Sequence, residues 1–138
     1  MKTAGTSGTT TSLWMATETM PEFGSLDKDI TVDVCVIGGG IAGLTSAYLL
    51  SKEGLDVALI DDGPLASGET SRTTAHLTNV LDDTFTKLEF LFGEDNSKLA
   101  AKSHAVAIDK IEEIINKLHI ECDFARVNGY LFKAPNYT

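Results

Sequence analysis

Residues 32–47 read VDVCVIGGGIAGLTSA, an apolar run that leads through three glycines directly into a helix-forming segment. This order predicts a buried strand, a tight turn and a helix whose first turn meets the pyrophosphate of a dinucleotide. Gly38 permits the turn, Gly40 lets a phosphate approach backbone that a Cβ would cover, and Gly43 lets the helix lie close to the strand. Unpaired N–H groups and the positive end of the helix dipole then attract the anion.

The residues after the turn complete a βαβ pattern. Gly54 stands where the helix should end, and the run LDVALI at 55–60 has the composition of a second parallel strand. Asp61 and Asp62 follow that strand, and an acid about 20 residues after the glycines accepts hydrogen bonds from the adenosine ribose. The sequence therefore predicts a dinucleotide site. The alternative is an ordinary βαβ unit with a chance cluster of glycines.

Composition limits the classes of partner. The chain has 138 residues, with 20 acidic side chains against 11 basic ones and a formal net charge of −9. Such a charge argues against a nucleic acid or an anionic membrane as partner. Its two cysteines, Cys35 and Cys122, offer neither a disulfide framework nor metal-ligand spacing. With no apolar run of membrane-spanning length and no signal-peptide pattern, a cytoplasmic location is expected. The oligomeric state stays open.

Residues 63–79, GPLASGETSRTTAHLTN, are rich in small and hydroxylated side chains and predict a loop. Its hydroxyl and N–H groups suit phosphate or ribose oxygens, and Arg72 suits a pyrophosphate charge. A solvated surface loop is an equally good interpretation from the residues alone. His76 is a candidate proton carrier, although a structural role is the more common one for a single histidine.

Elsewhere the chain predicts two helices and a hairpin. Residues 1–29 read as a disordered Thr/Gly/Ser tail followed by an arm that packs on the domain surface. Asp82 or Asp83 would cap a short helix that ends at Gly93, a turn at 94–97 would cap the next helix, and an apolar stripe at helical spacing runs from 101 to 118. Asn128-Gly129 lies between two β-prone runs, which predicts a hairpin. Further parallel strands are missing, so the chain reads as the first part of a larger α/β protein.

The pattern resembles the N-terminal FAD-binding unit of the glycine oxidase and D-amino-acid dehydrogenase (DAO-like) family of flavoproteins. The resemblance rests on the glycine turn, Ala47, Gly54, Val57 and Asp61. Three further stretches resemble the branch that often carries a C-terminal Rieske domain, namely SLW at 12–14, SGETSRTTA at 67–75 and CDFxRVxGYLF at 122–132. The fold class implied is α/β, a Rossmann-like βαβ unit with additional helices and a β-hairpin, as an incomplete part of a two-domain flavoprotein. Residues 30–138 would be the N-terminal part of the FAD/NAD(P)-binding domain.

The resemblance implies FAD contacts from the glycine turn, the acids after the second strand and the following loop. The residues are Gly38, Gly40, Ile41, Ala42, Gly43, Asp61, Asp62, Gly68, Thr70, Ser71, Arg72, Thr73 and Thr74. Asp61 stands where the family more often has Glu, a shorter side chain with the same acidic role. Because family members are several times longer, catalytic residues and any [2Fe-2S] cluster would belong to a longer parent protein.

The implied function is an FAD-dependent oxidoreductase that oxidises the C–N bond of an amino acid or related amine, a small-molecule substrate, by hydride transfer to FAD. Two alternatives stay open. The chain could be a nucleotide-binding module or truncated fragment without catalysis, or an NAD(P)-dependent oxidoreductase, since Asp61 suits either cofactor.

Overall fold

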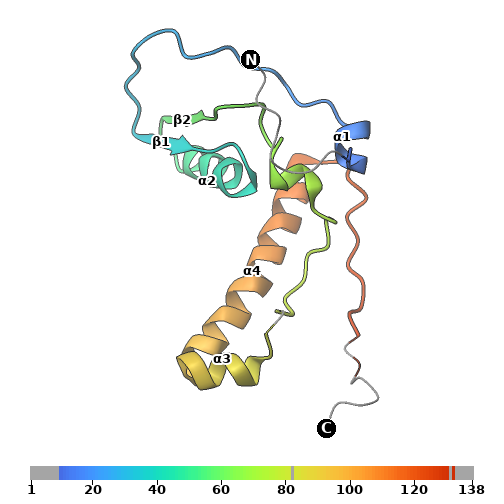
Figure 1. The fold of residues 1–138 in the computed structure, drawn as a ribbon. Helices are drawn as coiled ribbons and strands as arrows, with labels where there is room; N and C mark the ends of the chain where they lie inside the picture. Colours follow the sequence, from blue (N-terminus) through green and yellow to red (C-terminus); the bar gives the residue numbers. More distant parts are fainter. Residues whose placement is uncertain (1–9, 82, 131, 133–138) are drawn as a thin grey trace. The chain divides into compact units, whose positions relative to one another are not determined.

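The computed structural model describes residues 10–81, 83–130 and 132. The chain divides into two compact units, residues 1–75 and residues 76–138. Figure 1 traces the path of the chain through both.

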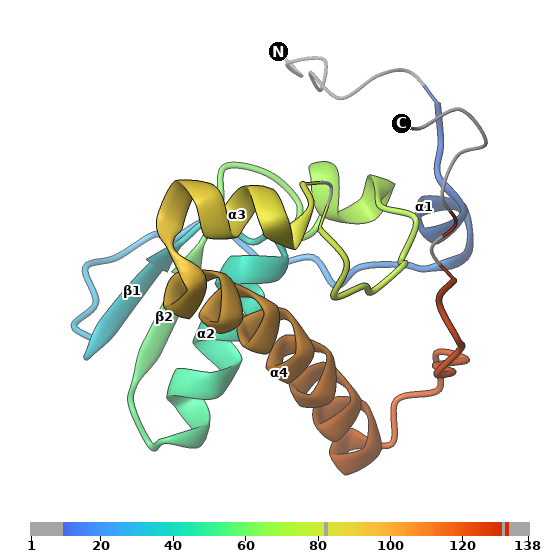
Figure 2. The same ribbon diagram turned by 90° about the horizontal axis from the view of Figure 1, so that it is seen from below.

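The first unit is built on a βαβ motif, as predicted. Strand β1 (Val34–Ile37) leads into helix α2 (Ile41–Lys52), and strand β2 (Val57–Ile60) follows. The strands pair in parallel with Val34 opposite Val57 and Ile37 opposite Ile60. Figure 2 shows the two strands side by side with α2 next to them. The mixed α/β fold class with a parallel strand pair is confirmed.

Helix α2 ends as its sequence predicts. Gly54 has a φ of 86°. The N–H of Gly54 donates to the carbonyl of Ser51 at 3.1 Å, and the N–H of Leu55 donates to the carbonyl of Leu50 at 3.3 Å. This pair of bonds is a Schellman motif, in which a left-handed residue closes the helix and turns the chain back towards the sheet.

The expectation of a buried first strand is only half met. Val34 and Val36 are partly covered, whereas the alternating residues Cys35 and Ile37 are exposed, Ile37 by 82%. None of the apolar side chains in the described ranges is fully buried. The physical reason is that successive strand residues point to opposite faces of the sheet, and α2 covers only one of these faces.

The N-terminal arm contains a short helix, α1 (Leu13–Thr17), capped by the hydroxyl of Ser12, which accepts a hydrogen bond from the N–H of Met15 at 3.2 Å. This helix lies beside a one-turn 3₁₀ helix, η1 (Glu69–Arg72) (Figure 1). Helix α1 of the arm therefore packs on η1. The prediction of a disordered tail covers residues 1–12, of which residues 1–9 lie outside the described residues. Thr10 accepts a hydrogen bond from Arg72, and Ser12 caps α1.

The second unit consists of helix α3 (Phe85–Phe92), helix α4 (Glu94–Leu118) and the segment that follows them. Thr84 caps α3 by accepting a hydrogen bond from the N–H of Lys87 at 3.3 Å, so the prediction of a cap at Asp82 or Asp83 is wrong. Asp82 itself lies outside the described residues. Gly93 ends α3 as expected, with a φ of 83°. Helix α4 begins immediately at Glu94, so the expected turn at 94–97 belongs to its first turn.

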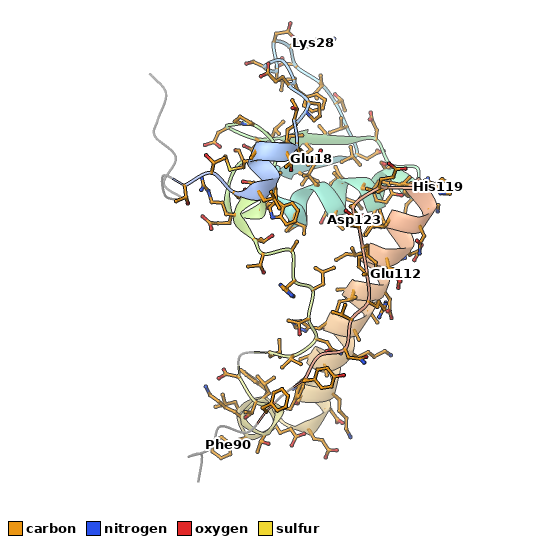
Figure 3. All side chains as sticks on the ribbon, turned by 90° about the vertical axis from the view of Figure 1, so that its right-hand side faces the viewer. Glu18, Lys28, Phe90, Glu112, His119 and Asp123 are labelled. Carbon is orange, nitrogen blue, oxygen red and sulfur yellow. The ribbon has the colours of Figure 1, made fainter. Side chains whose placement is uncertain are left out.

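After α4, residues 120–130 return along the helix without forming a strand. Arg126 donates from Nη2 to Glu112 Oε2 at 2.7 Å and to Asp109 Oδ1 at 2.5 Å. The bond to Glu112, followed by the bond to Asp109, raises the pKa of Arg126 above its ordinary range. Figure 3 labels Glu112 on α4 and Asp123 on the returning segment. Residues 120–130 contain neither helix nor strand, so the hairpin predicted at Asn128-Gly129 is absent from this described segment. An isolated pair of strands is marginally stable without a sheet to join.

Candidate dinucleotide site

The glycine turn is fixed by close contacts between strand and helix. Gly38 has a φ of 102°, which favours glycine, and its N–H donates to the carbonyl of Ile60 at 2.8 Å. A Cβ built on Gly43 would lie 1.8 Å from the carbonyl oxygen of Gly38 and 3.4 Å from Val36 Cγ1. No side chain fits there, because the nearest atom is backbone and cannot rotate away. The turn and packing roles predicted for these two glycines are therefore present in the structure.

The first turn of α2 offers backbone donors. The first intrahelical bond runs from the N–H of Leu44 to the carbonyl of Gly40 at 2.9 Å. The N–H groups of Ile41, Ala42 and Gly43 consequently have no acceptor within the helix, and they carry the positive end of its dipole. Gly40 is the N-cap and contributes no side chain. This arrangement fits an anion such as a pyrophosphate.

Thr70 stands at the same helix end. Its Oγ1 accepts a hydrogen bond from the N–H of Ile41 at 3.0 Å. A Cβ on Gly40 would lie 3.3 Å from that oxygen, which is tighter than an ordinary contact. Since a hydroxyl has one hydrogen to donate as well as lone pairs, Thr70 can still donate to a neighbouring oxygen. The bare backbone of Gly40 thus leaves room for both this hydroxyl and a phosphate oxygen.

Asp61 is held against the glycine turn from the end of β2. Its Oδ2 accepts from the N–H of Gly39 at 2.5 Å, and its Oδ1 accepts from the N–H of Gly63 at 2.8 Å. These two backbone donors, Gly39 first, hold the pKa of the Asp61 carboxyl below its usual value. The negative charge would repel a phosphate, so the carboxylate suits the neutral hydroxyls of a ribose, the role implied for it. Asp62, beside it, is exposed.

Gly39 was missed as a site residue, although it is the middle glycine of the motif. It is buried, and a Cβ on it would run into Leu65 and lie 3.2 Å from Asp61 Oδ2. Its carbonyl accepts from the N–H of Ala66 at 2.9 Å. The loop after β2 therefore folds over the turn, which requires a residue without a side chain at Gly39. The run of three glycines was the available signal.

The predicted loop is more ordered than its composition suggests, because its residues bond to one another. The hydroxyl of Ser71 donates to the carbonyl of Gly68, the N-cap of η1, at 3.1 Å. The hydroxyl of Thr73 donates to the carbonyl of Thr70 at 3.4 Å. Such local bonds from hydroxyl to backbone favour a tight turn, here one turn of 3₁₀ helix. Thr74, after that turn, is exposed.

The N-terminal arm also reaches this loop, a contact that sequence patterns did not indicate. Ser12 donates from Oγ to the carbonyl of Ser71, and Trp14 donates from Nε1 to the carbonyl of Thr73 at 2.9 Å. Arg72 donates from Nη1 to the carbonyl of Thr10 at 2.8 Å, while its Nε is buried with no hydrogen-bond partner among the described residues. Arg72 thus contacts the arm and retains an unused donor.

The described part of the chain holds no group of three or more His, Cys, Asp or Glu residues that could bind a metal ion. It also has no helix with the length and apolar character needed to cross a membrane. Cys35 and Cys122 are both free thiols on the surface. The residues that the structure brings together therefore suit binding of a nucleotide, and none of them forms an acid–base or nucleophile arrangement.

Comparison with known proteins agrees with this geometry. Residues 33–137 match the family described as DAO, FAD dependent oxidoreductase. The chain is 35% identical over 121 residues, 88% of its length, to YhfW of Bacillus subtilis (strain 168), which is named as a Rieske 2Fe-2S iron-sulfur protein. It is 32% identical over 114 residues, 83% of its length, to the gamma-glutamylputrescine oxidoreductase of Escherichia coli (strain K12).

The chain spans about a quarter of the length of these relatives, 24% of the first and 26% of the second. No solved structure matches it significantly. The family match covers the βαβ motif, the loop over the glycine turn and both helices of the second unit. The chain belongs to the DAO family of FAD-dependent oxidoreductases.

Proposed function

We propose that this chain binds FAD and supplies the dinucleotide-binding portion of an enzyme that oxidises the C–N bond of an amino acid or related amine. The observation that carries the proposal is the start of α2, where three N–H groups without helical acceptors stand beside the bare backbone of Gly40. A pyrophosphate needs such donors and such room.

We assign the remaining predicted residues to parts of the cofactor as follows. Ala42 and Gly43 would bind phosphate oxygens through their N–H groups, which have no acceptor within the helix. Thr70, whose Oγ1 accepts from the N–H of Ile41, would donate its hydroxyl hydrogen to a phosphate oxygen. Asp61 would accept from the adenosine ribose, with Asp62 adding contacts on that side. The other loop residues would pass near the flavin end. They are Gly68, Ser71, Arg72, Thr73 and Thr74.

The chemistry would come from the cofactor, because bound FAD accepts the hydride when a C–N bond is oxidised. The residues of this chain would bind the cofactor and orient it. An amine substrate is favoured by the Escherichia coli relative, whose name gives gamma-glutamylputrescine as the compound on which it acts. A [2Fe-2S] cluster is proposed only for a longer parent protein, on the name of the Bacillus relative. A cytoplasmic location is part of the proposal.

Titration of the full chain with FAD and, separately, with NAD tests the cofactor. FAD should bind and NAD should bind more weakly. Gly40→Val should reduce FAD affinity by at least about tenfold, since the branched side chain fills the space beside Thr70. Gly24→Ala is the matched control, because its new Cβ meets no atom within 4 Å. Equal FAD affinity in the wild type and Gly40→Val would contradict the proposed site.

The substrate class is tested in a full-length protein that contains this domain. Anaerobic mixing with amino acids and N-alkylated amines should bleach the absorbance of oxidised flavin, whereas matched alcohols should not. Reduction by the alcohols alone would overturn the C–N assignment and leave the FAD site intact.

A further inference from the structure

Three hydrogen bonds join the N-terminal arm to the loop beside α2. Ser12 and Trp14 donate to the carbonyls of Ser71 and Thr73, and Arg72 donates back to the carbonyl of Thr10. The partners lie about sixty positions apart in sequence, so these bonds are tertiary contacts. Both segments supply donors, since the arm donates through Ser12 and Trp14 and the loop donates through Arg72.

The held loop is the one that places Thr70. Thr70 lies within η1 (Glu69–Arg72), one residue before Ser71, and its hydroxyl accepts from the N–H of Ile41 at 3.0 Å. A one-turn 3₁₀ helix has poor hydrogen-bond geometry and little stability of its own. The arm holds the carbonyls of Ser71, which follows Thr70, and of Thr73, three residues on, and these contacts add to the bonds within the loop that place the Thr70 hydroxyl.

Helix α1 has the same dependence on its partner. It has five residues, far fewer than an isolated helix needs in water. Ser12 caps this helix, and the side chains of Ser12 and Trp14 also donate hydrogen bonds to the carbonyls of the loop. The arm around α1 and the loop around η1 thus stabilise each other. Both segments lose conformational entropy when the contact between them forms.

We propose that the N-terminal arm positions the Thr70 hydroxyl at the start of α2, with Ser12 and Trp14 as positioning residues for the cofactor site. We call the three hydrogen bonds of Thr10, Ser12 and Trp14 with the loop the clip. Arg72 then serves the clip through Thr10. The functional half of this inference rests on the proposed FAD site, while the structural half concerns the ligand-free chain alone. Removing the clip frees η1, and the N–H of Ile41 loses its acceptor.

Amide hydrogen exchange in the ligand-free full chain tests the structural half. The double variant Ser12→Ala/Trp14→Phe keeps the aromatic ring and removes both donors. The exchange of the Ile41 N–H should rise by roughly tenfold, because the acceptor Thr70 is no longer held in place. The exchange of the Leu44 N–H should stay constant, since its bond to Gly40 lies within α2. Unchanged exchange at Ile41 would overturn the proposal.

Two single variants separate the clip from general damage to α1. Thr17→Ala is the matched control, because the hydroxyl of Thr17 donates to the carbonyl of Leu13 within the same helix. Ser12→Thr keeps a hydroxyl at the capping position, so the exchange of the Ile41 N–H in this variant should equal that in the wild type. A rise at Ile41 in Thr17→Ala as large as in the double variant would contradict a specific role for Ser12 and Trp14.

FAD titration tests the functional half. The double variant should bind FAD about tenfold more weakly than the wild type and Thr17→Ala. If the wild type binds FAD and the double variant binds it equally well, the clip does not serve the site. If the wild type binds no FAD, the proposed function fails, and the exchange of Ile41 still decides whether the clip positions Thr70.

Discussion

The turn at Gly38–Gly43 and the turn predicted at Asn128–Gly129 both contain glycine, but only the first forms in the residues that the structure describes. At the first turn, β2 accepts the N–H of Gly38, Asp61 accepts the N–H of Gly39, and the helix lies so close that Gly43 has no room for a Cβ. At the second, a Cβ on Gly129 would meet no atom within 4 Å. Glycine permits a sharp turn in either place, and the contacts with β2 and Asp61 hold the first turn in shape.

The strongest test of this comparison is the same substitution at Gly43 and at Gly129. Alanine at Gly43 should raise helix propensity by about 1 kcal/mol, because glycine is a poor helix former. The clash of the new Cβ with the Gly38 carbonyl outweighs this gain in stability. We therefore expect Gly43→Ala to lower the free energy of unfolding by about 3 kcal/mol or more. Gly129→Ala should change it by less than about 0.5 kcal/mol. Urea denaturation of both variants measures the difference, and equal effects would contradict the comparison.

The carboxylate at the first turn should make its stability depend on pH. The backbone donors lower the pKa of Asp61 below its usual value of 3.8, so its stabilising contribution is complete above that pH and is lost as the pH falls through the lowered pKa. Asp61→Asn should reduce the thermal midpoint at neutral pH, by less than Gly43→Ala does. The gap between wild type and Asp61→Asn should narrow below about pH 4. A gap that stays constant down to acid pH would show that the charge plays no part.

Amide exchange in the segment 120–130, around Asn128–Gly129, should respond to salt instead. Arg126 and its partners Asp109 and Glu112 are partly solvent-exposed, and such ion pairs are weak and screened. Arg126→Gln should increase amide exchange within residues 120–130 modestly, and about 1 M salt should do the same to the wild type. Exchange in the glycine turn of the first unit should not change in either case. An Arg126→Gln variant with wild-type exchange in 120–130 would show that these ion pairs do not hold the segment.

Local patterns predicted the parts of the fold that local chemistry determines. The order of strand, glycine turn, helix and strand, the end of α2 at Gly54 and the packing role of Gly43 all follow from backbone freedom and periodicity. These features need no knowledge of distant residues beyond the pairing of the two strands.

The features that sequence patterns missed depend on distant partners. Trp14 meets Thr73 across 59 positions, and nothing in either local sequence indicates the pair. Gly39 is required because Leu65 and Ala66 fold over it. The predicted hairpin is absent from residues 120–130 for a related reason, since the described residues of the second unit contain no strand with which the segment near Gly129 could pair. Predicting such contacts would need the tertiary arrangement itself.

The central claim is that the start of α2 binds the pyrophosphate of FAD. Its most direct test is an amide NMR titration of the ¹⁵N-labelled full chain with FAD. The account predicts that the resonances of Gly40, Ile41, Ala42 and Gly43 shift, and that Gly129 stays unchanged. Binding of FAD that leaves those four amides unshifted would contradict the account.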